Sequence, residues 1–323
     1  LSKIKNNIEK TFNFNTINKF GDYAGLYELQ KIHKYKNPVL VSSIDGVGTK
    51  VSFLQSFLNE DAYKIVGEDI VNHGVNDILV KGAKPLFFLD YLGSKKLNPN
   101  YISEIVESIS VACIKNKCVL IGGETAEMSC TYNDNEIDIV GCMVGVVEKE
   151  NIIEGPLNII GGDIIVALPS EGLHTNGFTM IRKLKETLGY FPRDLMDWIS
   201  QPHKSYLDEI NMLIQKDITL LGLCHVTGGG LIENPKRVIA NHLKLIIDKK
   251  KLMNVYFDKI QQLGNIEDIE MYRTFNCGIG MMLFIHPEDL EKIKSIYTKN
   301  NVDYLELGTV QYRDTDEEQI QIV

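Results

Sequence analysis

The chain has 323 residues, of which 44% are hydrophobic, and this composition is typical of a globular protein with enough apolar surface for one or two cores. Its formal net charge is −9 and no block of Lys and Arg follows a groove-like pattern, which argues against a nucleic-acid-binding surface. The longest apolar runs, such as 279–285, are too short to cross a bilayer, and no apolar segment of a signal peptide is visible.

These properties predict a cytoplasmic protein with neither a nucleic-acid nor a membrane partner. The six cysteines are scattered along the chain, and no C-x-x-C pair occurs among them. Reduced, buried thiols are therefore expected in place of a cysteine zinc site or a disulfide framework.

The first half of the chain is predicted to alternate strands and helices after a polar N-terminal region. The first forty residues are interpreted as a helix followed by a mobile loop at 20–26. Strands are predicted at 39–44, 86–92, 119–121 and 137–147, and helices at 62–81 and 101–116. The turn formed by Asn98, Pro99 and Asn100 predicts the start of the second of these helices.

A charged stretch at 148–158 contains Gly155-Pro156 and breaks this periodicity, so it is the predicted boundary between domains at 1–150 and 156–323. Beyond it, strands are predicted at 163–168 and 278–285, and helices at 179–187, 205–215 and 231–240. Because both halves alternate helix and strand, the chain is predicted to form two α/β domains packed side by side.

The stretch Asp45-Gly46-Val47-Gly48-Thr49-Lys50 follows the first strand, at a place where α/β sheets commonly bind ligands. Gly46 and Gly48 allow the backbone to approach a phosphate closely, and Lys50 can act as a point charge on phosphate oxygens. The pattern is not a Walker loop, since G-x-x-x-x-G-K-[ST] is absent from the chain. The alternative is a tight strand-to-helix turn with an exposed lysine.

The predicted helix at 62–81 gathers short polar residues on one face. At about 100° per residue, Asp69, His73, Asn76 and Asp77 share this face. The opposite face carries Val71, Val75, Ile78 and Leu79. Carboxylates at helical spacing are good ligands for Mg²⁺, which prefers oxygen and often shares its coordination shell with phosphate. A solvated helix face with capping residues is the alternative, and the spacing leaves both open.

Further glycine-polar stretches follow other predicted strands. Gly122-Gly123-Glu124-Thr125-Ala126-Glu127 offers two acids for a metal shell, or acids that cap a helix start.

In the second half, His174 and Asn176 lie in a glycine-bounded loop, where a histidine can act as a general acid or base. Thr227, Gly228, Gly229 and Gly230 precede a predicted helix, whose N-terminal N–H groups suit a phosphate. A flexible connector is the alternative for this loop. Arg273 precedes a buried strand and can pair with a carboxylate or a phosphate.

These stretches, in this order and spacing, resemble the phosphoribosylformylglycinamidine cyclo-ligase family, also called AIR synthetases. The resemblance covers nearly the whole chain. The motifs that carry it include DGVGTK at 45–50, GGETAEM at 122–128, GVVE at 145–148, TGGG at 227–230 and MYRTFNCGIGM at 271–281.

The resemblance implies ring closure of formylglycinamidine ribonucleotide (FGAM) to aminoimidazole ribonucleotide (AIR), driven by ATP and Mg²⁺, with a role for K⁺ left open. It also implies a fold in which the N-terminal sheets of two subunits form a barrel, with ATP at the interface of a homodimer and a C-terminal α/β sandwich domain. A glycine loop near 21–25 would fold over ATP.

By the same resemblance, Asp45, Asp69, Asp77 and Glu124 would hold magnesium. Gly46, Gly48, Thr49, Asn76 and Thr125 would line the ATP site. Lys50 would meet the phosphates, and His174 would transfer a proton. The substrate would be bound by His174, Asn176, Thr227, Gly228, Gly229, Gly230 and Arg273.

The chain departs from the family pattern in three places. Ser129-Cys130 replaces the usual Pro-Gly, Ser43-Ile44 replaces Thr-Gly, and a tyrosine-containing segment that family members carry is missing before Leu1. Two other readings use the same scaffold. One is a selenophosphate synthetase-like or thiamine-phosphate kinase-like enzyme, although 20–26 lacks the cysteine expected of the former. The other is a non-catalytic nucleotide-binding protein.

Overall fold

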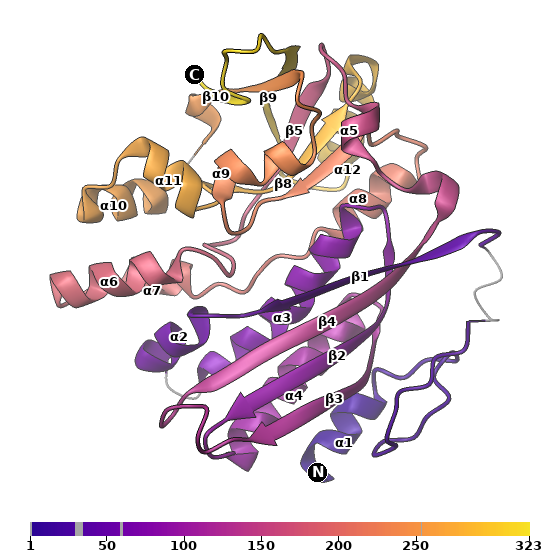
Figure 1. The fold of residues 1–323 in the computed structure, drawn as a ribbon, viewed down its shortest axis with the longest axis vertical. Coiled ribbons are helices and arrows are strands. Elements are labelled where there is room, and N and C mark those ends of the chain that lie inside the picture. Colours follow the sequence, from indigo (N-terminus) through magenta and orange to yellow (C-terminus); the bar gives the residue numbers. More distant parts are fainter. Residues whose placement is uncertain (1, 30–34, 59–60, 253) are drawn as a thin grey trace. The chain divides into compact units, whose positions relative to one another are not determined.

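The protein folds into two compact units, Leu1–Ile152 and Ile153–Val323, in a computed structural model that describes residues 2–29, 35–58, 61–252 and 254–323 (Figure 1). The division lies inside the charged stretch at 148–158. Each unit contains one mixed sheet and several helices, so the predicted two-domain α/β fold is confirmed. Within the described ranges, no helix combines the length and the apolar character needed to cross a bilayer.

Unit 1, residues 1–152, is built on a four-stranded sheet in the order β1-β4-β2-β3. Its strands are β1 (Pro38–Gly46), β2 (Lys84–Ser94), β3 (Val119–Glu127) and β4 (Ile137–Glu148). Its helices are α1 (Ser2–Glu9), α2 (Lys50–Leu58), α3 (Ala62–Leu79) and α4 (Pro99–Lys115). β2 and β3 run parallel, whereas β4 runs antiparallel to both β1 and β2.

Helices α3 and α4 cover one face of this sheet (Figure 1). α3 packs on β4 and β1, and it meets α4 closely at Gly67, where a Cβ atom would lie 2.6 Å from the Cβ of Ser108. α4 begins at the predicted turn, because the Asn98 side chain accepts a hydrogen bond from the backbone N–H of Asn100 and Pro99 occupies the first turn.

Unit 2, residues 153–323, contains a six-stranded sheet in the order β10-β7-β9-β5-β8-β6. Its strands are β5 (Ile164–Pro169), β6 (Gly222–His225), β7 (Leu243–Ile247), β8 (Ile279–Ile285), β9 (Leu305–Tyr312) and β10 (Ile320–Ile322). Its helices are α5 (Gly155–Asn158), α6 (Phe178–Leu188), α7 (Arg193–Ile199), α8 (Leu207–Ile214), α9 (Gly230–Glu233), α10 (Val255–Gly264), α11 (Asp268–Thr274) and α12 (Leu290–Lys299).

Strand β8 is central to this sheet, and every one of its residues is buried. Both β5 and β6 pair with it in antiparallel fashion, so β5 and β6 run parallel to each other on its two sides. The carboxyl ends of β5 and β6 therefore lie on the same side of the sheet, next to the start of β8. The loops that follow β5 and β6 begin there.

Two predicted element boundaries are wrong. β3 continues from the predicted 119–121 through Glu127, so the glycines and acids after Ile121 belong to a strand and do not cap a helix. The register explains the extension, because Gly122 through Glu127 pair with β2 residue by residue. The helix predicted at 231–240 is also wrong: α9 ends at Glu233, and a short 3₁₀ turn at Pro235–Arg237 follows it. Pro235 has no backbone N–H to continue the helix.

The N-terminal loop lies against the first residues of β3. Asn18 Nδ2 donates to the backbone carbonyl of Ile121 at 3.4 Å, and a Cβ atom at Gly25 would lie 2.7 Å from the Ile121 side chain. The glycine at 25 therefore allows this loop to approach the sheet.

Candidate functional site

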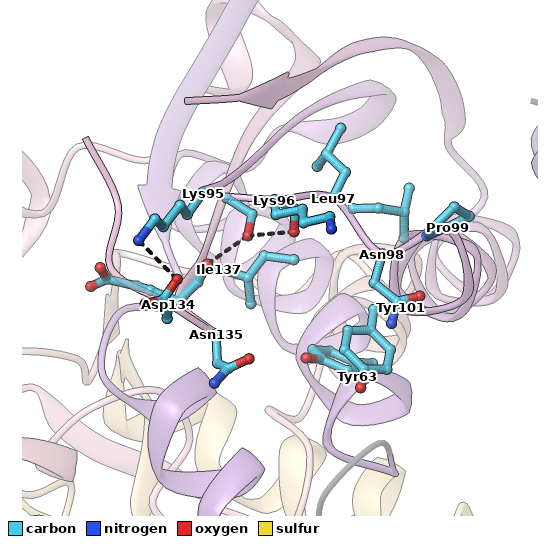
Figure 2. Close-up of a pocket in the computed structure, with 13 residues that line it drawn as sticks. Tyr63, Lys95, Lys96, Leu97, Asn98, Pro99, Tyr101, Asp134, Asn135 and Ile137 are labelled. Atoms are coloured by element: carbon cyan, nitrogen blue, oxygen red, sulfur yellow. Dashed lines mark hydrogen bonds and ion pairs between the residues drawn. The ribbon is translucent and has the colours of Figure 1, made fainter. Parts of the chain in front are cut away.

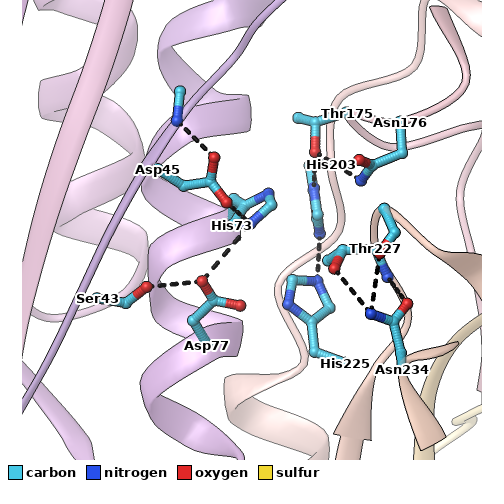
Figure 3. A network of polar contacts seen from close by, with 12 residues as sticks. Ser43, Asp45, His73, Asp77, Thr175, Asn176, His203, His225, Thr227 and Asn234 are labelled. Carbon is cyan, nitrogen blue, oxygen red and sulfur yellow. Dashed lines mark hydrogen bonds and ion pairs between the residues drawn. The ribbon is translucent and has the colours of Figure 1, made fainter.

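A cluster of two carboxylates and one imidazole links the end of β1 to α3 in unit 1. This acid–histidine cluster consists of Asp45, His73 and Asp77 (Figure 3). His73 Nε2 lies 3.0 Å from Asp45 Oδ2 and 3.6 Å from Asp77 Oδ2. Ser43 Oγ donates to Asp77 Oδ2 at 2.7 Å. The imidazole is 5% exposed, while the side chains of Asp45 and Asp77 are 51% and 26% exposed, so the carboxylates remain accessible.

His73 and Asp45 stabilise each other's charged forms, whereas the charge of Asp77 favours protonated His73 but opposes ionised Asp45. The hydrogen bond with His73 holds the pKa of the Asp45 carboxyl below its ordinary value. Burial disfavours the charged form of His73, but the hydrogen bond to Asp45 and the charges of Asp77 and Asp45 outweigh it and raise the pKa of His73. The two carboxylates therefore favour protonation of His73 relative to a free imidazole.

A buried ion pair lies next to this cluster, because Asp69 is one turn before His73 on α3. Lys50 Nζ lies 2.8 Å from Asp69 Oδ1, and both side chains are 0% exposed. Burial lowers the pKa of Lys50, and the negative charge of Asp69 opposes this shift. The alternative interpretation predicted an exposed lysine, and that prediction is therefore wrong. The structure brings the two predicted residues together, with the carboxylate of Asp69 facing the ammonium group of Lys50.

The polar face predicted for α3 is not solvated. Asp69 and Asn76 are 0% exposed and His73 is 4% exposed, while Val71 and Val75 on the apolar face are also buried. The alternative of a solvated helix face is therefore wrong for these positions. Asp77 is the member of this face whose side chain remains partly accessible.

A short glycine turn connects β1, which ends at Gly46, to α2, which begins at Lys50, as the sequence predicted. The backbone N–H of Gly46 donates to Asp45 Oδ1 at 2.7 Å, and that of Val47 donates to the Ile139 carbonyl at 3.0 Å. Gly48 has φ +64°, a left-handed conformation that glycine adopts without strain. Gly48 and Thr49 are exposed, so the turn presents backbone to solvent beside the Asp45 carboxylate.

Glu124 and Thr125 are exposed on β3, the edge strand opposite β1. Glu124 of β3 pairs with Tyr91 of β2, which pairs with Val140 of β4, which in turn pairs with Gly46 of β1. Three strand spacings of about 4.8 Å separate these edges by about 14 Å. Within one chain, the structure thus brings Asp45 and Asp77 together but leaves Glu124 at the other edge.

Asp45 and Asp77 fit a magnesium ion. Mg²⁺ takes oxygen ligands and usually binds proteins through one or two carboxylates, with water and phosphate completing its shell. The two carboxylates converge on His73 Nε2 and both reach solvent, whereas Asp69 is enclosed with Lys50.

In unit 2, the loop after β6 is held by the amide of Asn234. The backbone N–H of Thr227 donates to Asn234 Oδ1 at 2.9 Å, and Asn234 Nδ2 donates to the Gly228 carbonyl at 3.1 Å. Gly229 and Gly230 have φ +99° and +56°. A Cβ atom at Gly230 would lie 2.2 Å from the Tyr272 carbonyl oxygen, so glycine is required there by both conformation and space.

The loop after β5 meets this glycine loop. A Cβ atom at Gly228 would lie 3.1 Å from Asn176 Oδ1, so the predicted residues Asn176 and Gly228 are neighbours. His174 has φ +60° and is 0% exposed. Arg273, by contrast, is exposed on α11. The structure thus assembles the two predicted loops of unit 2 and buries the predicted catalytic histidine within them.

The segment between α11 and β8 supports these loops. Asn276 Oδ1 accepts hydrogen bonds from Ser170 Oγ and from the Gly278 backbone N–H, each at 3.0 Å. Its Nδ2 donates to the Gly172 carbonyl at 3.2 Å. Asn276 therefore fixes the start of the loop that carries His174.

Sequence reasoning did not single out two histidines beside His174. His203 Nε2 lies 2.9 Å from His225 Nε2 (Figure 3). The rings of His174 and His203 are stacked, with centroids 4.0 Å apart. His225 is the last residue of β6 and lies two positions before Thr227, so its place at a strand end was the available signal. His203 lies in a loop with no such pattern.

A separate pocket of unit 1, of about 480 Å³, lies between the end of β2, the start of β4 and the start of α4 (Figure 2). Tyr63 and Tyr101 form an aromatic pair in its wall, with ring centroids 4.6 Å apart, and Lys95 pairs with Asp134 at 2.8 Å. None of its lining residues belongs to the predicted site.

Comparisons with known proteins agree over both units. Residues 21–147 match the family model "AIR synthase related protein, N-terminal domain", and residues 161–321 match the model of its C-terminal domain. A phosphoribosylformylglycinamidine cyclo-ligase of Clostridium botulinum is 42% identical over 314 residues, which cover 96% of this chain and 90% of that protein. The enzyme of the same name in Geotalea daltonii is 41% identical, covering 94% of this chain and 88% of that protein.

Solved structures with the same fold are more distant in sequence. A thiamine-monophosphate kinase from Stenotrophomonas maltophilia has a TM-score of 0.71 and 13% identity, covering 99% of this chain and 94% of that one. A hydrogenase maturation protein HypE in complex with ATP has a TM-score of 0.64 and 14% identity, covering 97% and 84%. At such identities the likeness shows the fold alone.

Proposed function

This chain belongs to the phosphoribosylformylglycinamidine cyclo-ligase family, and on that premise we propose that it converts FGAM and ATP into AIR, ADP and phosphate, a ring-closing step of purine biosynthesis. The formamide oxygen of FGAM takes the γ-phosphoryl group of ATP, and ADP departs. The amidine nitrogen then attacks the activated carbon, loses a proton, and phosphate leaves as the imidazole ring forms. An amide oxygen is a poor leaving group, and phosphorylation makes it a good one.

The observation that carries this proposal is the convergence of Asp45 and Asp77 beside an exposed glycine turn in a chain of this family. In the proposal, these carboxylates hold Mg²⁺, which when bound neutralises phosphate charge. Gly46, Gly48 and Thr49 supply backbone close to the phosphates. Asn76 and Thr125 line the ATP site.

The buried pair of Lys50 and Asp69 is proposed to support the glycine turn of residues 46–49. Lys50 begins α2 directly after Thr49, and its ammonium group lies 2.8 Å from Asp69. The pair therefore holds the start of α2 against α3, and the Lys50 charge acts on the phosphates from behind the turn. A direct role of Asp69 as a magnesium ligand requires this pair to separate when Mg·ATP binds.

Unit 2 is proposed to bind FGAM through Asn176 and the loop of Thr227, Gly228, Gly229 and Gly230, with Arg273 as a further phosphate contact. His174 is proposed to accept or donate the proton of ring closure. Holding both reacting ends of FGAM lowers the entropic cost of forming a five-membered ring.

A homodimer is proposed to complete the site. The sheet face away from α3 carries exposed apolar side chains, with Leu40 at 56% and Ile44 at 70% exposed on β1. Burying them against a second copy is favourable because apolar surface leaves water. Closing two such sheets into a barrel would place partner strands beside both edges, which is how Glu124 would join the magnesium ligands. ATP would then lie at the subunit interface.

The experiment is an incubation of the purified chain with FGAM, ATP and Mg²⁺, followed by measurement of AIR and ADP. Equal amounts of both products are expected. ADP without AIR would indicate a different ATP-using enzyme on this fold, and neither product would indicate a nucleotide-binding protein without activity. Replacing K⁺ in the buffer by tetramethylammonium tests the monovalent ion, and the cytoplasmic location is tested by fractionation of cells.

A further inference from the structure

The histidine cluster of unit 2, His174, His203 and His225, has the composition of a transition-metal site. The three side chains are 0%, 0% and 7% exposed. One ring nitrogen of each lies within 4.8 Å of one nitrogen of each of the others. Imidazole is a preferred ligand of zinc, copper and nickel.

The fold explains why three residues far apart in the sequence meet. β5 and β6 end at the same edge of the sheet, on the two sides of β8. His225 ends β6, and His174 lies in the loop that follows β5. The segment of His203 is fixed to this edge by Tyr206, whose hydroxyl donates to the Pro169 carbonyl at 2.9 Å.

Gly280 of β8 gives these side chains their space. A Cβ atom there would lie 1.7 Å from the Tyr206 hydroxyl oxygen and 2.8 Å from His174 Cε1. Any larger residue would force the two rings away from the sheet edge. The cluster therefore depends on a glycine at the second position of an otherwise apolar strand.

The distances suit a small divalent ion after modest ring rotation. With zinc–nitrogen bonds of about 2.0–2.1 Å in tetrahedral geometry, two ligand nitrogens lie about 3.3 Å apart. His203 Nε2 and His225 Nε2 are 2.9 Å apart, so a small opening admits the ion. The His174 ring, now stacked on His203, would turn a nitrogen toward the same point.

The hydroxyl group of Thr175 lies near the second ring nitrogen of His203. Thr175 Oγ1 is 3.4 Å from His203 Nδ1, the nitrogen opposite the one that faces His225. Metal-binding histidines commonly use the second ring nitrogen to donate to an oxygen, which orients the ring and fixes its tautomer. Thr175 is placed to accept such a bond.

We propose that His174, His203 and His225 bind one divalent transition-metal ion of the zinc class, with a fourth position open to water. Three histidines and one exchangeable ligand are a known zinc coordination. A His174 nitrogen that coordinates the ion cannot also transfer the proton of ring closure, so a bound metal would assign that proton transfer to another group. The inference does not depend on the proposed ring closure, because it is tested by binding alone.

The test is a titration of the chelator-treated full chain with Zn²⁺ by isothermal calorimetry. Zn²⁺ can also bind the acid–histidine cluster of unit 1, so the titration is made in a His73→Gln background. One ion per chain is expected. His203→Gln is expected to weaken it by at least about 100-fold, the upper end of what loss of an outer-shell partner costs. His242→Gln, at an exposed histidine outside the cluster, is the matched control and should bind as the background does.

A second measurement covers the case in which a variant fails to fold, as judged by circular dichroism. X-ray absorption of the zinc-loaded His73→Gln protein should show three imidazole nitrogens at about 2.0–2.1 Å. Equal Zn²⁺ affinity in the background and in folded His203→Gln protein, or a shell of oxygen ligands, would overturn the proposal.

Discussion

The acid–histidine cluster of unit 1 and the histidine cluster of unit 2 are built in opposite ways. In unit 1, opposite charges hold one another, and two of the three residues, His73 and Asp77, lie one turn apart on a single helix. In unit 2, three imidazoles come from three separate segments and are positioned by loops around a sheet edge. Attraction between opposite charges therefore positions the side chains of the unit 1 cluster, whereas the backbone geometry of loops positions those of the unit 2 cluster.

The prediction with the largest expected effect tests whether paired charges stabilise unit 1. Asp69→Ala should lower the free energy of unfolding by about 3–5 kcal/mol, because the buried Lys50 ammonium loses the carboxylate that faces it. Urea denaturation measures this. The double variant Asp69→Leu with Lys50→Met should recover most of the loss, since no charge then remains buried. If the double variant is no more stable than Asp69→Ala, side-chain packing and not charge holds this region.

The next prediction concerns the carboxylates that reach solvent. Asp45→Asn and Asp77→Asn should each weaken Mg·ATP binding by about 100-fold, if loss of a direct ligand costs as much as the largest outer-shell effects. Equilibrium dialysis with labelled ATP measures this, and Glu107→Gln, at an exposed carboxylate on α4, is the control. The sequence-based expectation that Asp69→Asn weakens binding far more than His73→Ala is tested in the same series. Equal effects of those two variants would contradict a direct role for Asp69.

Backbone geometry in unit 2 is tested by two neighbouring glycines. Gly230→Ala should destabilise the protein by about 1–3 kcal/mol, because it forces a left-handed residue and a close contact with the Tyr272 carbonyl. Gly228→Ala adds only a contact at 3.1 Å to Asn176 and should be much milder. Thermal unfolding of the two variants compares them. Similar losses would mean that conformation at 230 is not the constraint.

The smallest effect is a shift in titration. The pKa of His73 should lie above its ordinary value of 6.5, and Asp45→Asn should lower it. Because the folded pKa is raised, the stabilisation is fully present below the unfolded pKa of His73 and is lost as pH rises through the folded value. For Asp45, whose pKa is lowered, stabilisation is lost as pH falls through its folded value. Histidine NMR titration measures the shift, and an unchanged His73 in Asp45→Asn would contradict the charge-balanced cluster.

The sequence predicted the unit 1 cluster better than that of unit 2 for a physical reason. Helical periodicity places His73 and Asp77 on one face whatever the rest of the chain does. Nothing in the local sequence connects His174, His203 and His225, because their meeting depends on the pairing of β5 and β6 with β8. The extension of β3 through Glu127 was missed for the same reason, since it follows from pairing with β2.

The sequence by itself determined the alternation of helix and strand, the turn that begins at Asp45, the family, and the helix face that carries the acids. Only the tertiary structure decided that Lys50 is buried against Asp69, that Glu124 lies at the edge opposite Asp45, and that three histidines meet beside Gly280. Local patterns are fixed by bond geometry over a few residues, whereas these contacts depend on which distant segments exclude water together.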